Sequence, residues 1–198
     1  MRRVCIGLIA LAAPARADVP EMPPAYAQLF DQAHTWSYDV ATTTYDVEDF
    51  HKARPPKRTT HTIVTCKVTM VMAMPHGAAS RVACDGTIDP TVTIAGDYGA
   101  TADGLFRIPG FPKTEADIAN GTPIFPAKPH PFRHSDHDAV HGLRSSAHAW
   151  CLFDDTSHDD GGFTRSQCFE ANVGIASGEL EGGGDDWRRV SYHLKSKP

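Results

Sequence analysis

The chain has 198 residues, 41% of them hydrophobic, and a formal net charge of −5 at pH 7 with histidines counted as neutral. This length fits one domain that can bury a core, and an acidic chain without basic clusters argues against nucleic acid or an anionic membrane as a partner. No segment beyond the first 17 residues is apolar enough to cross a bilayer, so we expect a protein that does not span a membrane.

The first segment has the order of a secretory signal peptide. Residues 1–3 (Met-Arg-Arg) are basic at two positions, residues 4–13 are apolar, and residues 15–17 (Ala-Arg-Ala) form a small-x-small cleavage site. A transmembrane helix needs about 20 apolar residues, and this stretch is shorter. We therefore expect residues 1–17 to be removed and residues 18–198 to form a single domain in a bacterial periplasm or outside the cell. With the three arginines of the signal gone, the net charge changes from −5 to −8.

An apolar stripe and then an alternating pattern follow the signal. Residues 23–33 predict a short amphipathic helix, since Tyr26, Leu29 and Phe30 recur at helical spacing after two prolines. Residues 36–47 change to a period of two and are rich in threonine and aromatic residues, which predicts a strand.

The next pattern predicts a β-hairpin over residues 60–89. Apolar residues alternate with polar ones on both sides of a turn at residues 75–77. On this alternation Met70 shares the core face with Cys66, and so do the methionines at 72 and 74. Cys84 falls on the apolar face of the second strand, so a bridge across the hairpin is possible.

Four cysteines remain after cleavage of the signal, and an even number in an exported chain is first interpreted as disulfides. Three pairings are possible, but the hairpin favours Cys66 with Cys84. The turn-like sequence Asp-Asp-Gly-Gly at 159–162 lies midway between Cys151 and Cys168 and favours the second pair. Four thiolates on a metal is the alternative, although no Cys-x-x-Cys spacing is present.

Residues 107–144 differ from the rest, because they contain six prolines and many histidines. Prolines at this density predict an irregular insertion without a regular strand or a long helix. One helical turn is expected at residues 115–119, where Thr114 and Asp117 resemble a capping box. A connection of this length usually has a function or is mobile. The alternative is an ordered surface insertion.

Strand patterns return near the C-terminus, at residues 147–153, 163–170, 173–180 and 187–194. Seven or eight strands joined by short turns, without βαβ alternation, predict a mainly β fold. We expect an antiparallel curved sheet, as a half-barrel or barrel, with a short N-terminal helix and the proline-rich insertion.

This layout is similar to that of periplasmic lipoprotein-carrier half-barrels and their exported bacterial relatives. The shared features are an N-terminal helix, a curved antiparallel sheet and a late aromatic-rich hairpin, here Cys168-Phe169 followed by Val173-Gly174-Ile175. The resemblance implies binding of acyl chains in a concave apolar face, and it identifies no functional residue. The proline-rich insertion and the two disulfides depart from the pattern of that group.

Five histidines lie between residues 130 and 148, and they form the one candidate metal site. If residues 134–141 make a helical turn, His134, His137 and His141 share a face, because they stand at i, i+3 and i+7. Three imidazoles, with Asp136 or Asp138 as an oxygen ligand or orienting partner, would suit zinc or copper. The alternative is that the His-rich loop is simply a soluble surface.

No catalytic constellation stands out, so we expect a non-enzymatic protein that binds a small apolar or amphipathic ligand, or a protein partner, in the concave face of its sheet. A pocket lined by Trp36, Tyr38, Val68, Met70 and Trp150 would favour this hypothesis. A metal-binding protein that uses the histidine cluster is the second hypothesis, and a small periplasmic hydrolase is the third.

Overall fold

The computed structural model describes residues 22–45, 56–86, 94–126, 133–134, 139–145, 149–158, 161–183 and 187–195. In these ranges the chain forms one twelve-stranded antiparallel sheet with two very short helices. The predicted signal peptide lies outside them. No helix in the described ranges is both long and apolar enough to cross a bilayer.

The elements follow in chain order. They are η1 (Ala27–Phe30), β1 (Thr35–Tyr45), β2 (Pro56–Met74), β3 (Gly77–Cys84), β4 (Gly96–Thr101), β5 (Gly104–Ile108), α1 (Glu115–Ala119), β6 (Thr122–Pro126), β7 (Arg133–His134), β8 (Ala139–Ser145), β9 (Ala149–His158), β10 (Gly161–Glu170), β11 (Gly174–Gly183) and β12 (Arg188–Leu194). The order across the sheet is β6-β5-β4-β3-β2-β1-β12-β11-β10-β9-β8-β7.

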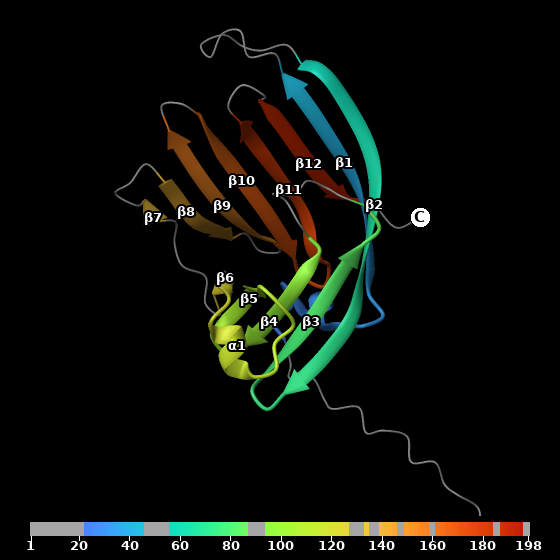
Figure 1. Cartoon of the computed structure of the whole chain (residues 1–198), viewed down its shortest axis with the longest axis vertical. Coiled ribbons are helices and arrows are strands. Elements are labelled where there is room, and N and C mark those ends of the chain that lie inside the picture. Colours follow the sequence, from blue (N-terminus) through green and yellow to red (C-terminus); the bar gives the residue numbers. More distant parts are fainter. Residues whose placement is uncertain are drawn as a thin grey trace, which may run out of the picture.

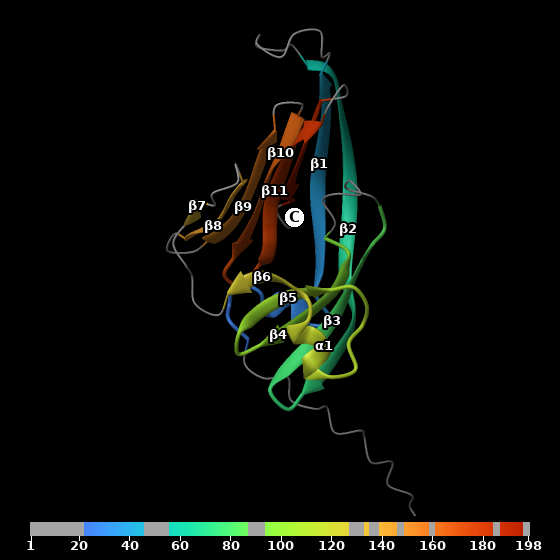
Figure 2. The same ribbon diagram turned by 60° about the vertical axis from the view of Figure 1, so that its left-hand side comes forward.

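Figures 1 and 2 show that the sheet is strongly curved and resembles a nearly closed barrel, with β3–β6 below β9–β11. The prediction of a mainly β, antiparallel, curved sheet is therefore confirmed. The alternation in β1 defines its inner face: Trp36, Tyr38 and Val40 are buried, and they pair with Cys66, Val64 and Thr62 of β2.

The two arms of the sheet meet through aromatic side chains. Phe125 of β6 lies 6.1 Å from the ring of Trp150 on β9 and 5.8 Å from the ring of Phe169 on β10, centroid to centroid. Tyr26, just before η1, packs against the same phenylalanine at 5.8 Å. We call this region, formed by β3–β6, residues 66–74 of β2 and the aromatic ends of β9 and β10, the closed part.

We call the rest of the sheet the open part: β7, β8, the remainder of β9 and β10, β11, β12, β1 and residues 56–65 of β2. The open part is bounded on one side by β7 and on the other by residues 56–65 of β2, which lie beyond the end of β3.

The N-terminal helix is shorter than predicted. Only Ala27–Phe30 are helical, in a 3-10 turn, instead of residues 23–33. The helix ends at Asp31, whose carboxylate accepts the N–H of Ala33 at 3.0 Å and so replaces a further helical bond. Leu29 and Phe30 are nevertheless buried, and they cover one end of the core.

The expectation that residues 107–144 contain no regular strand is wrong, although residues 109–114 are irregular. β6 contains Pro123 and Pro126, and β8 pairs with β9 along its length. β6 is the last strand of the sheet, and a proline without an N–H is tolerated at such an edge. The expected helical turn is confirmed as α1, with a capping box between Thr114 and Asp117.

The predicted core position of Met70 is also wrong. The register of β2 and β3 shifts between Val68 and Met70, so Met70 pairs with Arg81 and is 44% exposed on the outer face. A bulge of this kind reverses the alternation, and Val71 takes the place against the core. On the same outer face Ile118 of α1 is fully buried against Gly99 of β4, where a Cβ would come within 2.6 Å of it.

Candidate functional site

Both predicted disulfides are confirmed. Cys66 of β2 is bonded to Cys84 of β3, and Cys151 of β9 to Cys168 of β10, each between Cα atoms 4.0 Å apart. The members of each pair stand directly opposite one another in the strand register. Two disulfides are typical of proteins in an oxidising compartment, such as a periplasm or the extracellular space.

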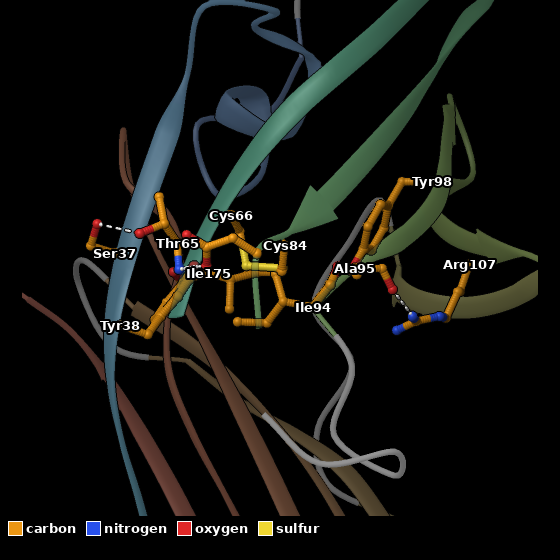
Figure 3. The surroundings of a disulfide bond; sticks show 11 residues. Ser37, Tyr38, Thr65, Cys66, Cys84, Ile94, Ala95, Tyr98, Arg107 and Ile175 are labelled. Carbon is orange, nitrogen blue, oxygen red and sulfur yellow. Dashed lines mark hydrogen bonds between the residues drawn. A yellow bond between two sulfur atoms is a disulfide. The ribbon is translucent and has the colours of Figure 1, made fainter. Parts of the chain in front are cut away.

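The first disulfide marks a boundary in the sheet (Figure 3). Cys66 is fully buried and belongs to the inner face. One residue further, Asp85 donates its N–H to the carbonyl of Thr65 at 2.9 Å, and its carboxylate accepts the N–H of Thr65 at 2.7 Å. The Asp85 side chain thus takes the position of the next strand residue, and the β2–β3 ladder ends there.

Aromatic donors of β1 are tied to the loop and strand that follow β10. The indole nitrogen of Trp36 donates to the carbonyl of Val173 at 2.8 Å, and the hydroxyl of Tyr38 donates to the carbonyl of Ile175 at 2.8 Å. Both side chains are buried. These hydrogen bonds satisfy the polar atoms that burial would otherwise leave unpaired, which is a structural role.

Burial raises the pKa of four tyrosines. The pKa of Tyr26 rises to about 12, and the pKa values of Tyr38, Tyr98 and Tyr192 also lie above the ordinary value, in each case mainly because burial disfavours the phenolate. The hydroxyl of Tyr192 accepts a hydrogen bond from the Gln167 amide at 3.1 Å. All four are therefore neutral at physiological pH, which does not suit a general base.

Of the five side chains named above for a pocket, four belong to the core cluster or pack against it, and Met70 is apart from them. Trp36, Tyr38 and Val68 belong to the buried core, Met70 faces outward, and Trp150 is half-buried against Phe125. The first three support the interior packing. They do not line an open surface.

The histidine cluster is only partly within the described residues. His134 lies in β7 and His141 in β8, so the helical turn expected at these two positions is wrong there. In the register His134 pairs with Val140, and His141 pairs with Arg133, which offsets the two histidines by one position. His137, Asp136 and Asp138 lie outside the described residues. Within the described ranges no three His, Cys, Asp or Glu residues are grouped to hold a metal, and the site stays a prediction.

The inner face of the open part carries a feature that the sequence analysis did not single out. Val190 of β12 pairs with Leu180 of β11, and both are buried. One step further along, Phe163 of β10 pairs with Gly182 of β11. The strand alternation places Phe163 on the same face as Gln167, whose amide reaches inward to Tyr192.

Phe163 is 43% exposed, and it lies one same-face position beyond the row in which Leu180 and Val190 are buried. A Cβ at Gly182 would lie only 2.7 Å from the Cα of Phe163, so no side chain can stand between Phe163 and the neighbouring strand. The alternation of Phe163, Arg165, Gln167 and Phe169 in the sequence could have indicated this face.

No protein-family model matches the sequence, and a search of curated proteins finds no similar sequence. The candidate site is therefore described by its own residues: an exposed phenylalanine one same-face position beyond the buried Leu180 and Val190, in a sheet with two disulfides.

Proposed function

We propose that this chain is an exported, non-enzymatic binding protein of the bacterial periplasm or cell exterior, and that it takes an apolar or amphipathic ligand on the inner face of the open part. The observation that carries the proposal is Phe163, a large apolar side chain that is 43% exposed and lies one same-face position beyond the buried Leu180 and Val190.

Two further features support it. The two disulfides suit an oxidising compartment, in agreement with the signal-like N-terminus. A curved antiparallel sheet with an apolar inner face also agrees with the resemblance to lipoprotein-carrier half-barrels, which implies an acyl chain as ligand. Function is a property of a site and not of a fold, so the proposal depends on the surface around Phe163.

Arg165 gives the same face an amphipathic character. It follows Phe163 by two residues, so it stands on the same side of β10, and it is exposed. A ligand with an apolar chain and an acidic head could place the chain against Phe163 and the head near the guanidinium. This combination favours a fatty-acid-like ligand over a purely apolar one.

The experiment is a fluorescence titration with cis-parinaric acid, a fluorescent fatty acid, on the mature protein. Phe163→Ser is compared with Met70→Ser, which removes an equally exposed side chain (43% against 44%) from the outer face of β2. We expect Phe163→Ser to weaken binding about 5- to 10-fold, because roughly 1 kcal/mol of apolar contact is lost, and Met70→Ser to leave binding unchanged. Absence of binding by the original protein, or an equal loss in both variants, would contradict the proposal.

A further inference from the structure

Over residues 56–64, one side of β2 pairs with no strand among the described residues. β2 has 19 residues and its neighbour β3 has 8, so the two strands pair only from Cys66 onward. Residues 56–65 pair with β1 on one side. In the described ranges no strand pairs with them on the other side, and Figures 1 and 2 show this half of β2 rising beyond the end of β3.

Two hydrogen bonds tell which backbone groups face that open side. Val68 donates its N–H to the carbonyl of His34, so the even-numbered residues of β2 are bonded to the side of β1. Thr65 is bonded to Asp85 on the opposite side. Because the direction alternates along a strand, Thr59, His61 and Ile63 direct their N–H and C=O groups to the open side.

The local sequence favours an extended conformation that can accept another strand. Six of the seven residues from 59 to 65 are β-branched threonine, isoleucine or valine. Residues 56–63 are exposed, and Ile63 is 49% exposed on the outer face. An exposed, extended edge of this kind is a template for pairing with another chain.

We propose that a second copy of this chain occupies the edge, by antiparallel pairing of residues 59–63 with the same residues of the other copy about a two-fold axis at His61. His61 then faces His61, and Thr59 faces Ile63, in both directions. These pairs form about six backbone hydrogen bonds and join two sheets into one, with the outer faces continuous.

The charges of the segment select this arrangement. Lys57 and Arg58 are adjacent, so a parallel pairing of identical strands would set four positive charges side by side. In the antiparallel register the two basic ends lie about 26 Å apart. Each basic end comes beside the other copy's Asp85, the residue at which the β2–β3 ladder ends. Exposed Ile63 is covered by Thr59 of the other copy.

Cysteine cross-linking tests the register. In the mature protein, His61→Cys places two thiols directly opposite one another, whereas Thr59→Cys places them about 13 Å apart, beyond the reach of a disulfide. We expect oxidation at micromolar concentration to give a covalent dimer with His61→Cys and at least 10-fold less with Thr59→Cys. Equal yields in the two variants would overturn the proposed register.

Size-exclusion chromatography with light scattering tests the dimer itself. His61→Pro removes an N–H that the monomer does not use in pairing with β1, so we expect a dimer fraction at least 10-fold lower and an unchanged near-ultraviolet circular dichroism spectrum. His61→Gln keeps the N–H and should keep the dimer. If the unsubstituted protein stays monomeric at about 100 µM, the proposal is overturned, and a strand of a different protein becomes the candidate partner of this edge. A dimer unaffected by His61→Pro would overturn it as well.

Discussion

The closed and open parts belong to one sheet, but they are stabilised differently. In the closed part, aromatic rings from strands far apart in the sheet meet at Phe125, Trp150 and Phe169. In the open part, residues 56–63 of β2 are exposed and are held by pairing with β1 alone in the described ranges. The comparison teaches that β-branched residues and a paired neighbour are enough to extend a strand, whereas closing the sheet requires large side chains that reach across its interior.

Replacing Phe125 should break the closed part and have the largest effect. We expect Phe125→Ala to lower the free energy of unfolding by about 3–5 kcal/mol, because a buried phenylalanine leaves a cavity among three other rings. Phe163→Ala is the matched control in the open part, and its cost should stay below about 1.5 kcal/mol since that side chain is 43% exposed. Urea unfolding monitored by tryptophan fluorescence measures both, and equal losses would show that the two parts do not differ in this way.

The two disulfides allow a second test, because their loops are nearly equal, with sequence separations of 18 and 17. Loss of either bridge should therefore cost about 3 kcal/mol through the entropy of the unfolded chain. Replacing Cys66 and Cys84 by alanine should cost about 1 kcal/mol more than replacing Cys151 and Cys168, since Cys66 is fully buried and packs in the core. Thermal unfolding of the two double variants decides the order, and a less stable Cys151/Cys168 variant would reverse it.

A change of pH should have the smallest effect of the three. The free energy of unfolding should stay nearly constant around neutral pH and fall increasingly above pH 10. Burial raises the pKa of Tyr26 from 10.0 to about 12, so the unfolded chain loses its proton at a lower pH than the folded one. The stability contribution is complete below pH 10 and is lost as the pH rises toward 12. Tyr38, Tyr98 and Tyr192 act in the same direction.

Unfolding free energy measured between pH 9 and 12 checks this, with tyrosinate absorbance at 295 nm as the second signal. Tyr26→Phe should make the free energy of unfolding fall less steeply with pH, because it removes one of the tyrosines whose pKa is raised by burial. Tyr45, which is half-buried at the end of β1 in the open part, is the control position for a Tyr→Phe change. An unchanged slope in Tyr26→Phe would contradict the prediction.

Much of the fold could be predicted from local patterns. The period of two at Trp36, Tyr38 and Val40 indicates the inner face of β1, and the turn between Cys151 and Cys168 indicates their bridge. Both are properties of neighbouring residues. The turn at α1 was predictable for the same reason, since its capping box lies within four residues.

The features that the sequence did not reveal depend on the assembled sheet. Prolines are acceptable in β6 only because it is an edge strand, and its place in the sheet order is not a local property. The bulge that turns Met70 outward arises from the pairing of β2 with β3. The exposure of Phe163 likewise depends on what the rest of the chain leaves uncovered, so the candidate site could not be found by spacing alone.

The position of the Cys66–Cys84 bridge has a mechanical consequence. A hairpin that is pulled open from one end loses its ladder bonds one at a time, like a zipper, and so needs little force at each step. Here the covalent bond stands at the pair next to Asp85, where the β2–β3 ladder ends. A force that separates β2 from β3 at this end therefore meets the sulfur bridge before it can open the strand pairs that lie beyond it.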